Sequence, residues 1–215
     1  MKRFIFPILG FDILDVSCKN IISSGTGFLI NNDGHFFSAG HNFYKSKKRG
    51  EVEQVELSCF ALIKNQLIQI EKLYLEYDND STLSKKDFFV GKFKAPFCEQ
   101  EDNIKMESDE FFMTGYSIRD LPYETIESIQ FNNITFKLYK VPIISTSNIL
   151  NYGGINFSYE NVLYYNCEVI VDFYGLSGCP IFKSNKLYGL LISTFFITID
   201  YLKKIADSEL KIELD

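Results

Sequence analysis

Residues 25–41 read GTGFLINNDGHFFSAGH, and this stretch predicts a β-hairpin. Two short apolar runs, residues 27–30 and 35–38, flank the sequence Asn-Asn-Asp-Gly at residues 31–34. Asn, Asp and Gly tolerate the positive φ angles that tight turns between antiparallel strands require. Small residues follow the second run and lead to His41, one of two histidines in the chain. The stretch therefore places a histidine just after the second strand of a hairpin.

The rest of the chain has the same character, because short apolar runs alternate with turn-forming residues along its length. The other predicted strands cover residues 4–11, 52–62, 66–77, 88–93, 111–115, 126–131, 136–144, 162–170, 180–182 and 187–193. Only residues 199–210 place apolar side chains at helical spacing. Many short strands and one terminal helix favour an all-β fold, a sandwich or a pair of barrels, over βαβ units. The polar stretch 95–110 is the predicted boundary between two halves.

The composition narrows the possible partners. Of the 215 residues, 46% are hydrophobic and 16% are aromatic, and aromatic side chains favour strands. The chain has 28 acidic and 22 basic residues and a formal charge of −6, so it has no net basic field to hold nucleic acid. No apolar run approaches the roughly 18 residues that cross a bilayer. We therefore expect neither a nucleic-acid nor a membrane partner.

The five cysteines indicate reduced thiols rather than a metal or redox site. They are widely spaced and form no CxxC pair, so the sequence contains neither a zinc ribbon nor a thioredoxin-type redox site. This usage in a chain of this length is typical of a cytoplasmic protein. Residues 4–11 imitate a signal peptide, but Pro7 breaks the apolar run and Asp12 follows it at once. We interpret them as a first strand.

Two local patterns could carry chemistry. His41 follows small residues that leave room for a substrate, whereas His35 follows the turn and is expected to begin a surface strand. Residues 174–180 read YGLSGCP, in which Ser177 lies between glycines on a predicted tight loop. Such a loop exposes the hydroxyl, and Gly175 lets backbone N–H groups converge to stabilise an oxyanion.

The order of these residues along the chain decides between two hydrolase types. The nucleophile elbow of an α/β-hydrolase needs glycine where Cys179 stands and a histidine after the serine, and no histidine follows residue 41. The order His, Asp, Ser is that of the chymotrypsin-type triad. Residues 25–41, 87–93 (DFFVGKF) and 175–191 together resemble the histidine, aspartate and serine segments of trypsin-like serine peptidases, and composition favours a bacterial-type member.

This resemblance implies the chymotrypsin fold, two six-stranded Greek-key β-barrels with a C-terminal α-helix. The whole chain would then be one peptidase domain. Its N-terminal barrel would cover about residues 1–100, its C-terminal barrel about 110–198 and its helix about 199–212.

The resemblance also implies an activity and the residues that perform it. The chain would be a serine endopeptidase acting on protein or peptide substrates through an acyl-enzyme, with restricted targets and no cofactor. Ser177 would be the nucleophile, His41 the general base and Asp87 the acid that orients it, while the N–H groups of Gly175 and Ser177 would form the oxyanion hole.

The acid has two alternatives nearby. Asp78 and Asp80 lie in a polar stretch and are typical of turn formers, whereas Asp87 enters an apolar strand. A carboxylate at the start of such a strand is buried enough to orient an imidazole, so Asp87 is the preferred candidate.

Two residues depart from the family pattern. Leu176 stands where digestive and clotting relatives have the aspartate that pairs with a newly cleaved N-terminal amine, so we expect no activation of that kind. Nothing else in the sequence is seen to lock the loop, so a latent enzyme that needs a regulatory partner protein stays open. Cys179 replaces a glycine and is expected to fill a gap in the core.

Counting along the resemblance gives the substrate pocket. Val171 would form its floor, with Ile192, Ser193 and Thr194 near one wall, and an apolar floor favours an uncharged substrate side chain. A shift of one residue would bring Asp172 to the floor and reverse this preference.

Two further alternatives concern partners. The basic run at residues 45–49 (KSKKR) is interpreted as a solvated loop, with contact to an acidic substrate or regulator as the second reading. A non-catalytic module on the same fold, gripping a peptide at a strand edge, is the alternative to an enzyme.

Overall fold

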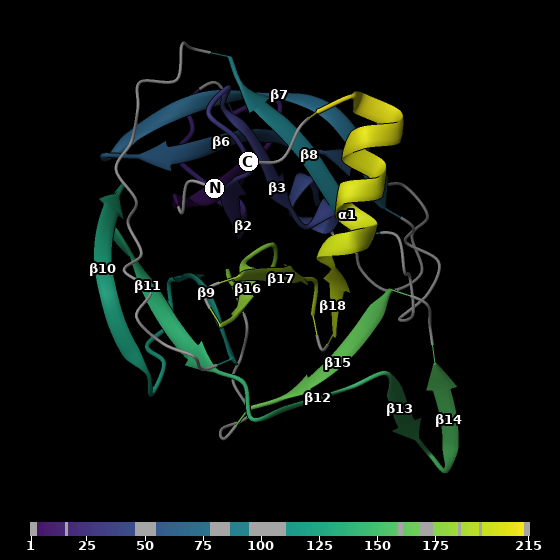
Figure 1. Ribbon diagram of the computed structural model, residues 1–215. Helices are drawn as coiled ribbons and strands as arrows, with labels where there is room; N and C mark the ends of the chain where they lie inside the picture. The colour runs from purple at the N-terminus through teal and green to yellow at the C-terminus, as the bar shows by residue number, and fades with distance from the viewer. Residues whose placement is uncertain are drawn as a thin grey trace.

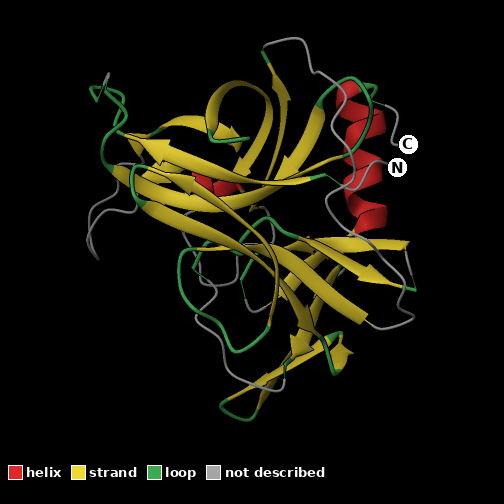
Figure 2. Ribbon diagram, turned by 90° about the vertical axis from the view of Figure 1, so that its left-hand side faces the viewer, coloured by secondary structure: helices red, strands yellow, loops and turns green. Residues whose placement is uncertain are grey.

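The computed structural model describes residues 4–15, 17–45, 55–77, 87–94, 111–158, 161–167, 174–184, 186–193 and 195–212. Within these ranges the chain is built mainly of strands, with one short helix near the C-terminus (Figures 1 and 2). The predicted all-β fold class is confirmed.

Six antiparallel strands of the first half close into a barrel in the order β1-β2-β3-β8-β7-β6 (Figure 1). Their bounds are β1 Ile5–Phe11, β2 Ile21–Leu29, β3 His35–Ser38, β6 Ser58–Ile63, β7 Gln66–Tyr77 and β8 Asp87–Phe93. A 3₁₀-helix, η1 (Gly40–Phe43), follows β3 and leads into the small sheet of β4 (Tyr44–Lys45) and β5 (Val55–Glu56). The first predicted barrel therefore has its expected six strands.

The hairpin of β2 and β3 forms at the predicted turn. Asn31 Oδ1 accepts hydrogen bonds from the backbone N–H groups of Asp33, at 3.1 Å, and His35, at 3.2 Å. Gly34 has a φ of +85°, a conformation that glycine adopts without steric cost. The strand that follows therefore delivers η1, which carries His41, to the end of the barrel.

Strand β1 buries both of its faces. In β1 the side chains of Phe6 and Ile8 join a cluster to which all six strands contribute, which is the barrel interior. Ile5 and Leu9 point to the opposite face and join a second cluster together with residues of the second half and of the C-terminal helix. The continuous apolar run at the start of the chain is therefore a strand between two cores.

The described strands of the second half form one eight-stranded sheet in the order β10-β11-β9-β16-β17-β18-β15-β12, which differs from the six strands expected for the second barrel. Their bounds are β9 Phe111–Ser117, β10 Glu124–Phe131, β11 Ile134–Pro142, β12 Ser145–Ser147, β15 Val162–Asn166, β16 Pro180–Lys183, β17 Lys186–Leu191 and β18 Phe195–Thr198. The hairpin of β13 (Ile149–Tyr152) and β14 (Ile155–Ser158) stands apart from this sheet (Figure 1). The sheet has its own apolar core, so the second half is a separate packing unit.

The predicted C-terminal helix is confirmed. It consists of α1 (Ile199–Ile205) and a π-helical turn, η2 (Ala206–Leu210). It begins directly after β18 (Figure 1). The Tyr201 ring lies edge-on to Phe88 of the first barrel, with ring centroids 6.0 Å apart. Leu202 and Ala206 are fully buried in the cluster that joins the two halves. The helix therefore fastens the second half to the first. No helix in the described ranges is long and apolar enough to span a membrane.

Candidate active site

His41 and Asp87 are held together by two hydrogen bonds. The backbone N–H of His41 donates to Asp87 Oδ1 at 2.7 Å, and the imidazole Nδ1 lies 2.7 Å from Asp87 Oδ2. Asp87 is the first residue of β8, which pairs with β3, the strand just before His41. The carboxylate is only 6% exposed, and because an ionised carboxylate only accepts, Nδ1 carries the proton. This arrangement leaves Nε2 as the basic nitrogen.

The small residue before His41 allows this close approach. A Cβ on Gly40 would lie 2.6 Å from the backbone oxygen of Glu76 and 3.0 Å from Asp87 Oδ1. Asp87 is thus the described carboxylate that contacts His41. The alternatives Asp78 and Asp80 lie outside the described residues.

The second histidine has a different role. His35 begins β3, as predicted, and its Nδ1 lies 3.1 Å from Asn31 Oδ1 in the hairpin turn. Burial, with the charge of Lys92, lowers the pKa of its imidazole below the ordinary value. His35 does not line the cleft described next, so it is a turn residue.

The histidine and the serine face one cleft. Ser177 lies on the loop between Tyr174 and Pro180, partly exposed, and its hydroxyl makes no hydrogen bond to any described residue. The cleft has a volume of about 500 Å³ and is lined by residues of β2, η1, β4 and the serine loop: Ile22, Ser23, Ser24, His41, Asn42, Tyr44, Lys45, Tyr174, Gly175 and Ser177. A candidate nucleophile and a candidate base thus share a space large enough for a peptide segment.

The serine loop presents two backbone donors to this cleft. The N–H groups of Gly175 and Ser177 donate to no other group in the described part of the chain. The carbonyl of Leu176 accepts from the N–H of Cys179 at 2.9 Å and so points into the loop. Because the peptide bond is trans, the N–H of Ser177 points the opposite way. This geometry suits an oxyanion hole.

A clasp of hydrogen bonds from the first barrel holds the loop, and sequence reasoning missed it. Thr26 of β2 donates through its N–H to the carbonyl of Ser177, at 2.9 Å, and through its hydroxyl to the carbonyl of Gly175, at 2.8 Å. The side-chain amide of Asn42, which follows His41, also donates to the Ser177 carbonyl at 2.9 Å. Both residues are buried, and a buried threonine hydroxyl carries no sequence signal beyond its place in the hairpin. The clasp therefore connects β2 and η1, the element that carries His41, to the loop that carries Ser177.

Leu176 anchors the loop from the other side. Its side chain is fully buried in the core of the second half, in the same cluster as Met113, Leu191 and Cys179. Burial raises the pKa of the Cys179 thiol, which fills the core as predicted. The contacts that lock the loop come from within the chain, through the clasp and this leucine.

Truncation of Leu176 tests this anchor. We expect Leu176→Ala to lower the free energy of unfolding by about 2–5 kcal/mol, because it leaves a cavity in a packed core. Leu14→Ala is the matched control, since Leu14 is 87% exposed and its loss is expected to cost less than about 0.5 kcal/mol. Urea unfolding of both variants measures the difference, and equal costs would contradict the anchoring role.

The predicted substrate pocket is only partly covered by the structure. Val171 and Thr194 lie outside the described residues. The side chain of Ile192 is 2% exposed and packs in the cluster between the two halves. Ser193 is exposed, and its carbonyl accepts from the Tyr165 hydroxyl at 2.7 Å. A substrate-binding role for these four residues stays a prediction.

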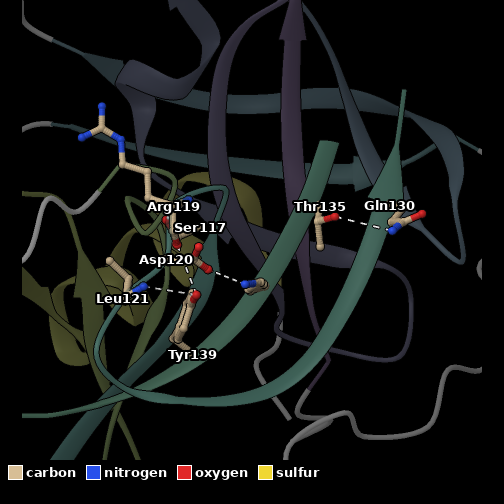
Figure 3. Close-up of polar contacts among 8 residues, drawn as sticks. Ser117, Arg119, Asp120, Leu121, Gln130, Thr135 and Tyr139 are labelled. Carbon is tan, nitrogen blue, oxygen red and sulfur yellow. Dashed lines mark hydrogen bonds and ion pairs between the residues drawn. The ribbon is translucent and has the colours of Figure 1, made fainter. Parts of the chain in front are cut away.

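Residues 117–121, at and after the end of β9, form a loop held by hydrogen bonds, and its Arg119 lies beside Tyr174 of the cleft lining. The Tyr139 hydroxyl donates to the Arg119 carbonyl and accepts from the Leu121 N–H, each at 3.2 Å, and Ser117 Oγ accepts from the Arg119 N–H at 3.0 Å (Figure 3). The guanidinium points away from these bonds in Figure 3 and lies 5.4 Å from the centre of the Tyr174 ring. The loop therefore places a cation beside the residue that begins the serine loop.

No group of three or more His, Cys, Asp or Glu side chains within the described ranges could hold a metal ion.

Comparison with known proteins rests on structure, since no protein-family model and no curated protein matches the sequence. The scabies mite inactivated protease paralogue S-D1 is similar with a TM-score of 0.58 and 12% identity over 99% of this chain and 95% of that one. The active form of Rv3671c protease from M. tuberculosis is similar with a TM-score of 0.54 and 14% identity, over 100% of this chain and 82% of that one. Deg5 is similar with a TM-score of 0.53 and 14% identity, over 95% of this chain and 87% of that one.

These similarities concern the fold, and they do not single out a bacterial branch. A closed six-stranded barrel, a second sheet and a C-terminal helix match the architecture of these proteins over nearly the whole chain. The chain therefore has the two-barrel fold of trypsin-like serine proteases.

Proposed function

We propose that the chain is a serine endopeptidase that cleaves protein or peptide substrates through Ser177, His41 and Asp87. The observation that carries the proposal is the meeting of three features at one cleft: an imidazole bonded to a buried carboxylate, a serine on a glycine-flanked loop, and two backbone N–H groups that bond to no described residue. The likeness to proteases supports the fold needed for this activity.

In the proposed reaction Ser177 Oγ attacks the carbonyl carbon of the scissile peptide while His41 Nε2 accepts its proton. The N–H groups of Gly175 and Ser177 hold the resulting oxyanion, and each such donor contributes about 3–4 kcal/mol to the transition state. Asp87 stays ionised and stabilises the imidazolium. His41 then gives the proton to the leaving amine, and water later releases the acyl group from Ser177 by the same route in reverse.

The proposal extends to the setting of the enzyme. The cysteines of the described ranges, Cys18, Cys59, Cys167 and Cys179, are free thiols, which supports an intracellular location. Restricted targets and an uncharged residue before the cut stay predictions made from the sequence.

A catalytically silent peptide-binding module is the second candidate, and one observation favours it. One of the similar structures is an inactivated protease paralogue, so the fold occurs without activity. The decision therefore depends on the reactivity of Ser177 rather than on the fold.

Labelling with a fluorophosphonate probe tests the two candidates. We expect the wild-type chain to be labelled at Ser177 and both Ser177→Ala and His41→Ala to be unlabelled, because the probe reacts with a serine activated by a base. Circular dichroism and thermal melting check that each variant is folded. A folded wild-type chain that stays unlabelled, beside a serine protease that labels in the same buffer, would support the binding module.

A further inference from the structure

One wall of the cleft is formed by Ile22, Ser23 and Ser24 of β2 together with Tyr44 and Lys45 of β4. We name these five residues the β2–β4 wall. Among the described residues that line the cleft, Lys45 carries the one permanent charge. The wall is thus a positive surface at the mouth of a site in a chain whose formal charge is −6.

The charge of Lys45 is only weakly compensated by the described residues around it. Its Nζ lies 4.0 Å from Asp12 Oδ2, and both side chains are close to half exposed, at 46% and 41%. An exposed ion pair of this length contributes little stabilisation, so it does not fix the position of either side chain. The ammonium is therefore available to a ligand.

The other acidic groups nearby already have partners. Glu56 of β5, the strand that pairs with β4, accepts from Lys72 Nζ at 2.6 Å. Asp87 is occupied by His41. Of the described carboxylates near this wall, Asp12 alone competes for Lys45.

The same wall contains a hydroxyl without a partner. Ser24 is 9% exposed, and its Oγ makes no hydrogen bond. Buried hydroxyls are nearly always bonded, so this one is a polar atom on the wall that the described residues leave unsatisfied. Because the oxygen itself is buried, the contact with a ligand rests on Lys45.

The wall adjoins His41 in the cleft lining, and Lys45 follows His41 by one turn of η1 and the start of β4. In the proposed reaction His41 gives its proton to the leaving amine, so a side chain close to His41 is suited to contact the residues that follow the cleaved bond. Building on the proposed function, we propose that Lys45 selects substrates with Asp or Glu among the first three residues after the cleaved bond. Lys45 acts here as a specificity residue and takes no part in bond breaking.

Matched peptides test this selection. Substrates found by random-library cleavage are remade in pairs that differ only by Glu against Gln at each of the three positions, all with amidated C-termini so that a terminal carboxylate is excluded as the source of the effect. We expect kcat/KM to be about 1.5- to 5-fold higher for Glu at one position, the range for an exposed ion pair, and the difference to shrink in 0.5 M salt.

Three variants separate Lys45 from a general charge effect. Lys45→Gln should abolish the preference for Glu, Lys45→Glu should reverse it to a preference for Gln, and Asp12→Asn should increase it. Lys137→Gln is the control, because Lys137 of β11 pairs with Asp120 and lies outside the cleft lining. It should keep the wild-type preference.

The outcomes also separate this inference from the proposed function. Cleavage with no difference between Glu and Gln peptides, or a difference that survives in Lys45→Glu, overturns the role of Lys45 and leaves the peptidase intact. Failure of both cleavage and fluorophosphonate labelling overturns the peptidase. Binding of the same peptides to Ser177→Ala, followed by fluorescence anisotropy, then still decides whether Lys45 holds a carboxylate.

Discussion

Replacing Asp87 by asparagine is expected to lower turnover about ten-thousandfold with little change in stability. Asparagine has nearly the same shape, and its oxygen still accepts from the His41 backbone N–H, as Asp87 Oδ1 does at 2.7 Å. Its NH₂ group then faces Nδ1 in place of Oδ2, so it donates where the carboxylate accepted. The imidazole must carry its proton on Nε2, and that tautomer cannot take the proton of Ser177.

Steady-state cleavage of a peptide substrate and thermal melting together measure this effect. Asp120→Asn is the matched control, because Asp120 is 85% exposed and pairs with Lys137 on the surface. An exposed pair contributes about 0–1 kcal/mol, so this control should retain full turnover. A turnover of Asp87→Asn within tenfold of wild type would show that another group orients His41.

Replacing Gly178 by alanine is expected to disrupt the serine loop and to cost more than about 3 kcal/mol of stability. Gly178 has a φ of +89°, which side-chain-bearing residues rarely adopt. An added Cβ would lie 2.3 Å from the carbonyl oxygen of Thr26 and 2.7 Å from the backbone nitrogen of Ala39. Both are backbone atoms of the first barrel, so neither moves without breaking the clasp.

Urea unfolding and fluorophosphonate labelling report the two parts of this result. Gly153→Ala is the control, since Gly153 also has a positive φ, +60°, but an added Cβ meets nothing within 4 Å. Its backbone strain alone should cost about 1–2 kcal/mol and leave labelling unchanged. If Gly178→Ala cost no more than Gly153→Ala and labelled normally, the close packing of the two halves at this loop would be irrelevant to the site.

Both predictions concern the same structural principle, which is that the two halves meet at the serine loop. The nucleophile belongs to the second half, through Leu176 in its core, while the base and its carboxylate belong to the first barrel. The clasp of Thr26 and Asn42 crosses between them. A change in the relative position of the halves would therefore alter the geometry of every proposed catalytic contact.

Much of the fold could be predicted because its signals are local. The turn at residues 31–34 depends on side chains within four positions of one another, such as Asn31 and His35. The helix at residues 199–210 depends on the spacing of its own apolar residues, and the strands on short apolar runs. The preference for Asp87 also rested on a local argument, the start of an apolar strand, and the contact with His41 agrees with it.

Other features could not be predicted, because they join distant parts of the chain. The hydrogen bonds from Thr26 to Gly175 and from Asn42 to Ser177 link residues 149 and 135 positions apart. Neither donor belongs to a pattern that marks it in the sequence. The basic run at residues 45–49 gave two readings, a solvated loop and a contact with an acidic substrate or regulator, and only the position of Lys45 on the cleft wall favours the second.

Neighbouring residues along the chain were thus enough to predict most of the strands, the hairpin, the helix and the types of side chain able to perform hydrolysis, while β12, β13, β14 and β18 were not predicted. The packing of the two halves decided how the serine loop is held, which carboxylate touches the imidazole and which cation borders the cleft. The reason is physical: backbone preference depends on a few adjacent residues, whereas the clasp and the cleft exist only after two separately cored units have docked.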